Sequence, residues 1–119
     1  MSSVIKEQAA FLLDFCTLIK EAGRLDFIVT SGELLRTLEQ QKIYVQTGRS
    51  KTMHSLHLRK LAGDLNFFLN GMWINGLYPN EAKSVLQPVG SIWEALHPSN
   101  RWGGNFKGFV DAGHFERNV

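Results

Sequence analysis

The chain contains little cysteine, little proline and no long apolar run, and these shortages exclude several classes of protein. Cys16 is the single cysteine, which excludes an internal disulfide and any multi-cysteine zinc site. No stretch approaches the roughly 20 uninterrupted apolar residues that cross a bilayer, so we expect no membrane insertion. Lys6 and Glu7 interrupt the apolar residues at the start, which therefore does not resemble a secretory signal and predicts a product made in the cytoplasm.

Charge of one sign is also scarce. Thirteen Lys and Arg against eleven Asp and Glu leave a formal net charge of +2, which is too small for a dedicated nucleic-acid-binding protein. The 119 residues are 44% hydrophobic and 20% charged, as in an ordinary globular protein. We therefore expect one domain over residues 1–119, and we expect it to be a monomer.

The spacing of apolar residues predicts where the first helices and strand lie. Apolar residues recur at steps of three and four over residues 3–22, which indicates a helix that Gly23 ends. A β-favouring run follows at residues 27–29. Thr30 and Glu33 then form a capping-box pattern, which predicts that a second helix starts here and carries Arg36.

The second half of the chain is predicted to be rich in turns. Residues 65–68 favour a strand, and residues 79–96 favour a helix that Pro88 bends or splits. Residues 109–110 form a last short β-favouring run, and residues 111–116 look like a turn. Together these elements predict an α+β fold, with a small antiparallel sheet flanked by helices.

Two clusters of polar residues have the composition of a zinc site. His57 and Asp64 are seven residues apart, so the chain must turn back between them to place both on one ion. In the second cluster Asp111, His114 and Glu116 follow each other closely. The spacing allows His57, Asp64 and His114 as zinc ligands and Asp111 as the catalytic base. The HExxH motif that is common in zinc proteases is absent, however, and a histidine more often has a structural role than a metal-binding one.

Several of these residues have alternative interpretations. His54 is a rival ligand, although we expect it to be exposed, and His97 is expected to lie at a helix end. Asp64 taken alone is typical of a turn. Glu116 either orients His114 or forms a surface ion pair, and the sequence leaves both interpretations open.

Several separate blocks, in the same order, resemble one known family. They are RTLEQQ at 36–41, GRSKTM at 48–53, SLHLRKLAGDL at 55–65, WGGNFK at 102–107 and DAGHFE at 111–116. The chain between residues 27 and 116 thereby resembles the zinc peptidases of bacterial cell-wall peptides. That family includes the D-alanyl-D-alanine carboxypeptidases and the phage L-alanyl-D-glutamate endolysins.

The resemblance implies a site, position by position. It implies one zinc ion per chain, lying at the sheet, with Asp111 as the catalytic base and with these ligands: His57, Asp64 and His114. It further implies that Arg36 binds a substrate carbonyl or carboxylate and stabilises the oxyanion, and that Ser55 contacts the substrate peptide.

The chain departs from the family pattern at two positions. Lys60 stands where the family usually has glycine, and Gly113 stands where it often has proline. We expect Lys60 to crowd the turn between two ligands and Gly113 to loosen the turn before His114. Neither departure removes a ligand.

The resemblance predicts a zinc-dependent peptidase that cuts the stem peptide of bacterial peptidoglycan. It is most similar to a compact phage endolysin, cutting an L-alanyl-D-glutamate type of bond in the cell wall after release. A D-alanyl-D-alanine carboxypeptidase is one alternative, and a non-catalytic peptidoglycan-binding or virion structural module is another, against which the presence of Asp111 argues. A basic patch, interpreted as a solvated loop or a contact for an anionic wall polymer, comprises Arg49, Lys51, Arg59 and Lys60.

Overall fold

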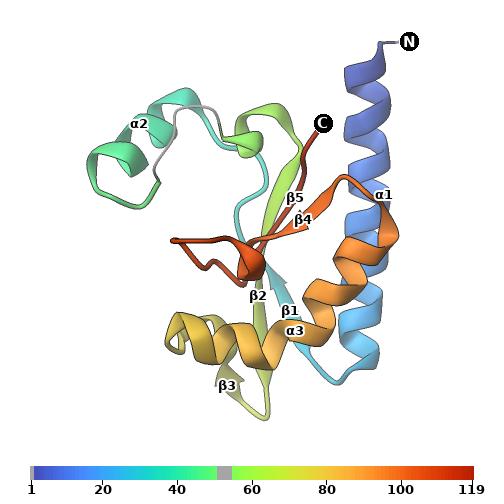
Figure 1. The fold of residues 1–119 in the computed structure, drawn as a ribbon, viewed down its shortest axis with the longest axis vertical. Coiled ribbons are helices and arrows are strands. Elements are labelled where there is room, and N and C mark those ends of the chain that lie inside the picture. Colours follow the sequence, from blue (N-terminus) through green and yellow to red (C-terminus); the bar gives the residue numbers. More distant parts are fainter. Residues whose placement is uncertain (1, 51–54) are drawn as a thin grey trace.

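The computed structural model describes residues 2–50 and 55–119, which form three α-helices and one antiparallel sheet (Figure 1). The helices are α1 (Ser3–Arg24), α2 (Leu38–Gln46) and α3 (Pro79–Leu96). The strands are β1 (Ile28–Ser31), β2 (Ala62–Leu69), β3 (Met72–Trp73), β4 (Asn100–Trp102) and β5 (His114–Arg117). The predicted α+β class is confirmed. None of the described helices is both long and apolar enough to span a bilayer.

The sheet places the last strand of the chain in its interior. Its strand order is β1-β2-β5-β4, and β3 pairs with β2 outside this path. All of these pairs are antiparallel. The register between β2 and β5 sets Asp64 opposite His114, which is 50 residues later in the chain.

The core lies between one face of the sheet and the helices α1 and α3. Each helix contributes four buried apolar residues to it, among them Phe15 of α1 and Trp93 of α3. Because successive side chains of a strand point to opposite faces, Leu65 and Phe67 of β2 enter this core while Asp64 points to the other face. α2 lies apart from α1, toward the opposite side of the molecule (Figure 1).

The two long helices agree with the sequence. α1 begins after Ser2, whose hydroxyl accepts a hydrogen bond from the Ile5 amide, and it continues two residues beyond the predicted end because Gly23 lies inside it. α3 is continuous through Pro88, so this proline does not split it, and Figure 1 shows that the helix bends.

The predicted start of the second helix was wrong. Thr30 belongs to β1 and pairs with Asn66 of β2. The helix begins at Leu38 instead, and the hydroxyl of Thr37 accepts the hydrogen bond from the Gln40 amide that caps it. Arg36 therefore lies in the loop before α2 and not within a helix.

The strand predictions were partly correct. The strand predicted at residues 65–68 is confirmed and extends over Ala62–Leu69. Residues 109–110 form no strand, and the segment from His114 that was expected to turn is β5. β3 and β4 were not predicted, because strands of two or three residues are too short to show a periodic pattern.

Candidate metal centre

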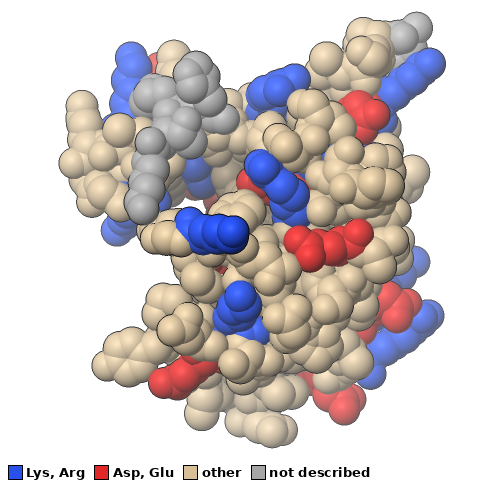
Figure 2. Space-filling view, in the orientation of Figure 1, with Lys and Arg blue, Asp and Glu red and all other residues tan. Residues whose placement is uncertain are grey.

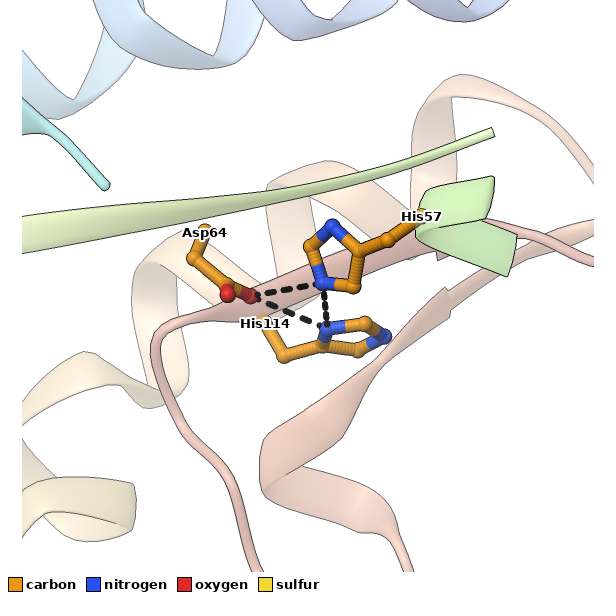
Figure 3. Close-up of side chains that lie close together, drawn as sticks. All are labelled: His57, Asp64 and His114. Carbon is orange, nitrogen blue, oxygen red and sulfur yellow. Dashed lines mark hydrogen bonds and ion pairs between the residues drawn. The ribbon is translucent and has the colours of Figure 1, made fainter. Parts of the chain in front are cut away.

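Three side chains from separate elements converge at the sheet. His57 lies in a short 3-10 helix (Leu56–Arg59), Asp64 in β2 and His114 in β5. The Nε2 atom of His57 is 3.2 Å from Nδ1 of His114 and 3.3 Å from Oδ1 of Asp64, and the last two atoms are 3.0 Å apart (Figure 3). One ligand atom from each residue lies within 4.8 Å of the others, so these three side chains could hold one metal ion.

A tight turn brings His57 back toward Asp64. The hydroxyl of Ser55 accepts a hydrogen bond from the His57 amide and starts the 3-10 helix. Lys60 ends the helix in the left-handed conformation, with φ 58° and ψ 34°, which favours glycine. Its side chain is exposed and lies beside α1, so Lys60 strains the backbone of this turn and does not crowd the ligands.

The outer nitrogens of both imidazoles have partners that can only accept a hydrogen bond. Nδ1 of His57 lies 3.0 Å from the Leu34 carbonyl, and Nε2 of His114 lies 2.7 Å from Oε1 of Glu116. Each outer nitrogen therefore carries a proton and donates it, so each inner nitrogen is the one that can offer a lone pair to a metal ion. Two imidazole nitrogens and one carboxylate oxygen are a donor set that suits catalytic zinc, with a fourth position left for water.

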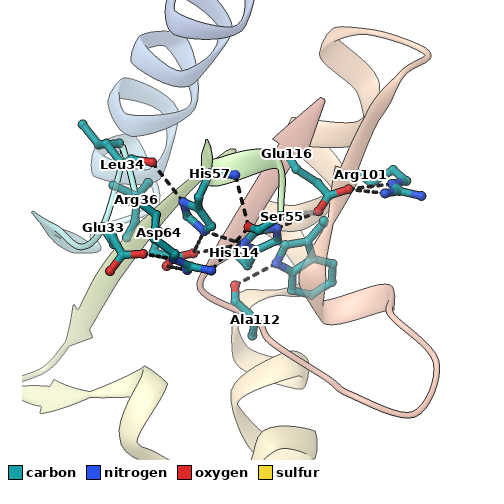
Figure 4. A network of polar contacts seen from close by, with 12 residues as sticks. Glu33, Leu34, Arg36, Ser55, His57, Asp64, Arg101, Ala112, His114 and Glu116 are labelled. Carbon is teal, nitrogen blue, oxygen red and sulfur yellow. Dashed lines mark hydrogen bonds and ion pairs between the residues drawn. The ribbon is translucent and has the colours of Figure 1, made fainter. Parts of the chain in front are cut away.

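Glu116 fulfils both of the roles that the sequence left open. Besides holding His114, its carboxylate accepts a hydrogen bond of 2.8 Å from Nε of Arg101 (Figure 4). Arg101 lies directly opposite Glu116 in the pairing of β4 with β5. A carboxylate held from both sides in this way fixes the orientation of the histidine ring.

The centre strongly favours positive charge. Burial opposes the ionised form of Asp64, but hydrogen bonds from His114 and His57 hold the pKa of this carboxyl well below its usual range. Burial also opposes the cationic form of His114, yet hydrogen bonds to Asp64 and Glu116 raise its pKa to about 9. A cation between these side chains, whether a proton or a metal ion, is therefore stabilised.

Asp111 lies at the turn that precedes β5. Its backbone carbonyl accepts a hydrogen bond of 3.2 Å from the His114 amide. Burial raises the pKa of this carboxyl above its usual value, against the attraction of His114. Asp111 and His114 line the same cavity, so the structure brings the predicted base to the predicted ligands.

Gly113 is explained by its neighbours. A Cβ atom at this position would lie 2.8 Å from the Leu65 carbonyl oxygen and would collide with the amide of Asn75. That amide donates to the Leu65 carbonyl and accepts from the Phe67 amide, both at 2.9 Å. The turn before His114 is therefore packed against Asn75, and the expectation that Gly113 loosens it is not met.

Arg36 and Ser55 lie beside the cluster (Figure 4). Nη1 of Arg36 donates to Oε1 of Gln41 at 2.6 Å and to the Ser55 hydroxyl at 3.3 Å, and Nε pairs with the Glu33 carboxylate. Nη2 lies 4.0 Å from Oδ2 of Asp64 and so faces the cluster. The loop before α2 thus places Arg36 beside the ligand cluster, as the sequence resemblance indicated, although Arg36 does not lie in the helix that was predicted to carry it.

A cavity of about 470 Å³ opens over the cluster. Figure 2 shows Lys and Arg side chains around the hollow between α2 and the body of the molecule. Arg101 and Phe106, to which the sequence analysis assigned no role, also line this cavity, and the Phe106 ring is 5.6 Å from that of His114. His97 does not line it, and His54 and Lys51 lie outside the described residues.

Comparisons with known proteins identify the fold and the family of this chain. No curated protein matches the chain. Among solved structures, the chain is similar to the L-Ala D-Glu endopeptidase ChiX of Serratia marcescens, with a TM-score of 0.58 and 24% sequence identity. The match covers 76% of this chain and 66% of that one, slightly less than two thirds of its length, and it supports the fold. A family model described as D-alanyl-D-alanine carboxypeptidase matches residues 48–117, more than half of the chain, and the chain therefore belongs to this family.

Proposed function

We propose that this protein is a zinc-dependent peptidase that hydrolyses the stem peptide of bacterial peptidoglycan. The observation that carries the proposal is the convergence of His57, Asp64 and His114, with the buried carboxyl of Asp111 at the same cavity. Membership of the D-alanyl-D-alanine carboxypeptidase family supports a peptidase of wall peptides. The likeness to an L-Ala D-Glu endopeptidase favours that bond as the one cleaved.

A zinc ion held by His57, Asp64 and His114 would polarise the scissile carbonyl and lower the pKa of a bound water toward neutrality. Asp111 takes the proton from the attacking water and passes it to the amine that leaves. The burial that raises the pKa of Asp111 brings this carboxyl closer to the working pH, which suits a group that must both accept and release a proton.

The neighbouring side chains position the substrate and the ligands. Nη2 of Arg36 faces the cluster, where a guanidinium stabilises the negative charge that develops on the carbonyl oxygen. The Ser55 hydroxyl lies between Arg36 and the His57 amide and contacts the substrate peptide from there. Glu116 accepts the hydrogen bond of Nε2 of His114, so Nδ1 would be the atom of this ring that holds the zinc ion.

The substitution Asp111→Asn tests this assignment. The amide keeps the shape of the side chain but cannot accept the proton, so turnover should fall by about 10² to 10⁴ while zinc content and melting temperature are kept. Asp26→Asn is a matched control, because Asp26 is exposed, does not line the cavity and has a positive φ that asparagine tolerates. A wild-type rate in Asp111→Asn would place the base elsewhere, with Glu116 the next candidate.

Mass spectrometry of digested peptidoglycan distinguishes the candidate activities. New termini between L-alanine and D-glutamate are expected from the zinc-loaded protein. Release of terminal D-alanine instead would identify a D-alanyl-D-alanine carboxypeptidase. Zinc-loaded protein that binds peptidoglycan and leaves every peptide bond intact would support the non-catalytic module.

A further inference from the structure

Four arginines line the cavity over the ligand cluster, and they differ in how their charge is balanced. Arg36 pairs with the Glu33 carboxylate, and Arg101 pairs with the Glu116 carboxylate. Arg49 and Arg59 have exposed side chains, and neither forms an ion pair with any carboxylate among residues 2–50 and 55–119. Two of the four positive charges are therefore not balanced by the described part of the chain.

The backbones of these two arginines are held in place. The Arg49 amide donates to the Tyr44 carbonyl at 2.8 Å, and the Arg49 guanidinium lies 5.9 Å from the centre of the Tyr44 ring. The Arg59 carbonyl accepts a hydrogen bond of 2.9 Å from Gln8 of α1. Anchoring the backbone limits where each guanidinium can reach, and both border the same cavity as the ligands.

Two side-chain carboxylates line the cavity, those of Glu116 and Asp111. Glu116 is bound by His114 and Arg101, and among the described residues Asp111 forms no ion pair with Arg49 or Arg59. Neither side-chain carboxylate therefore neutralises these two arginines. A cavity with two free guanidinium groups attracts an anionic ligand, and a guanidinium binds a carboxylate through paired hydrogen bonds.

We propose that Arg49 and Arg59 form a cationic subsite that binds a free carboxylate of the substrate close to the scissile bond. The inference rests on the proposed peptidase function, which supplies such groups from two sources. A glutamate that is joined to both neighbours through amide bonds keeps one carboxylate free, and a stem peptide that ends in D-alanine carries a terminal carboxylate. The shared chemistry is a peptide carboxylate within reach of two guanidinium groups.

Binding of three synthetic peptides to the metal-free protein tests the subsite without requiring turnover. The parent peptide contains L-Ala-D-Glu and ends in D-Ala-D-Ala; one analogue has the free glutamate carboxyl converted to an amide, and the other has the C-terminal carboxyl converted. We expect titration calorimetry to show that one of the two amidated analogues binds to the wild type about tenfold more weakly than the parent peptide does. The analogue that loses affinity identifies the source of the carboxylate.

The variants Arg49→Gln, Arg59→Gln and their combination should bind the parent weakly and lose the preference for the carboxylate. Lys42→Gln is the matched control, since it removes the same charge from α2 at an exposed position that does not line the cavity. This control should keep the full preference.

Three results would overturn the subsite: equal or unmeasurable binding of all three peptides by the wild type, a preference that survives in the double variant, or a preference that Lys42→Gln also abolishes. The last result would mean that net charge alone attracts the peptide. Failure of the peptidase function is distinguishable, because zinc-loaded protein would then leave the parent peptide uncut while Arg49→Gln still lost the preference for the carboxylate.

Discussion

Replacing Lys60 by glycine should stabilise the protein, although it removes a side chain. Lys60 has a φ of 58° at the turn between His57 and Asp64. An L-residue in the left-handed conformation costs roughly 1–2 kcal/mol, because Cβ approaches the following carbonyl oxygen. Glycine removes that cost but adds about 0.5–1 kcal/mol of backbone freedom to the unfolded chain. The exposed lysine loses few contacts, so we expect a net gain of about 0.5–1 kcal/mol.

Thermal unfolding of the metal-free protein, followed by circular dichroism, measures this gain. For a chain of this length the melting temperature should rise by about 2–5 °C. Lys20→Gly is the control, because Lys20 is exposed within α1, where glycine costs about 1 kcal/mol. It should lower the melting temperature by a similar amount. A lower melting temperature for Lys60→Gly would refute the argument and show that the lysine side chain stabilises this turn.

Two further predictions concern the surroundings of Asp64. Gly63→Ala should destabilise the protein by about 1–3 kcal/mol in the same assay, because the new Cβ would lie 2.6 Å from Cζ of the buried Phe15. The additional substitution Phe15→Leu should relieve part of this loss. An unchanged melting temperature of Gly63→Ala would contradict the packing argument. Zinc binding at pH 7 should release about one proton, because the pKa of about 9 keeps metal-free His114 protonated and a ligand must be deprotonated, so zinc affinity should rise with pH up to that value. Calorimetry in buffers of different ionisation enthalpy counts the proton, and a count near zero would show that His114 is neutral before zinc binds.

The elements that the sequence predicts well are those with long periodic patterns. From Phe11 to Ala22 the buried residues of α1 recur at steps of three and four, and from Ala82 to Trp93 those of α3 do the same. Thr30 and Thr37 show the limit of a local pattern, since each is followed three residues later by Glu or Gln. Only Thr37 caps a helix, because Thr30 is paired with Asn66 in the sheet. That pairing joins residues 36 positions apart and leaves no trace in a local window.

The candidate site also contains residues that the sequence indicates and contacts that only the structure shows. Sequence resemblance indicated His57, Asp64, His114 and Asp111, and the structure brings them together although spacing alone could not decide their roles. The contact between Arg101 and Glu116 depends on the register of β4 with β5, and β4 is too short to be recognised from the sequence. Such contacts follow from strand pairing and become visible only in three dimensions.

The interior position of β5 governs the order in which the fold can be completed. This strand is the last in sequence, yet it separates β2 from β4 and carries His114. Until residues 114–117 dock, both neighbouring strands expose unpaired edges and only two of the three candidate ligands are in place. A contact across 50 residues forms slowly compared with a local turn. A chain in which residues 114–117 have not docked therefore lacks the complete set of candidate ligands, so the candidate metal centre forms late, in the same step that closes the sheet.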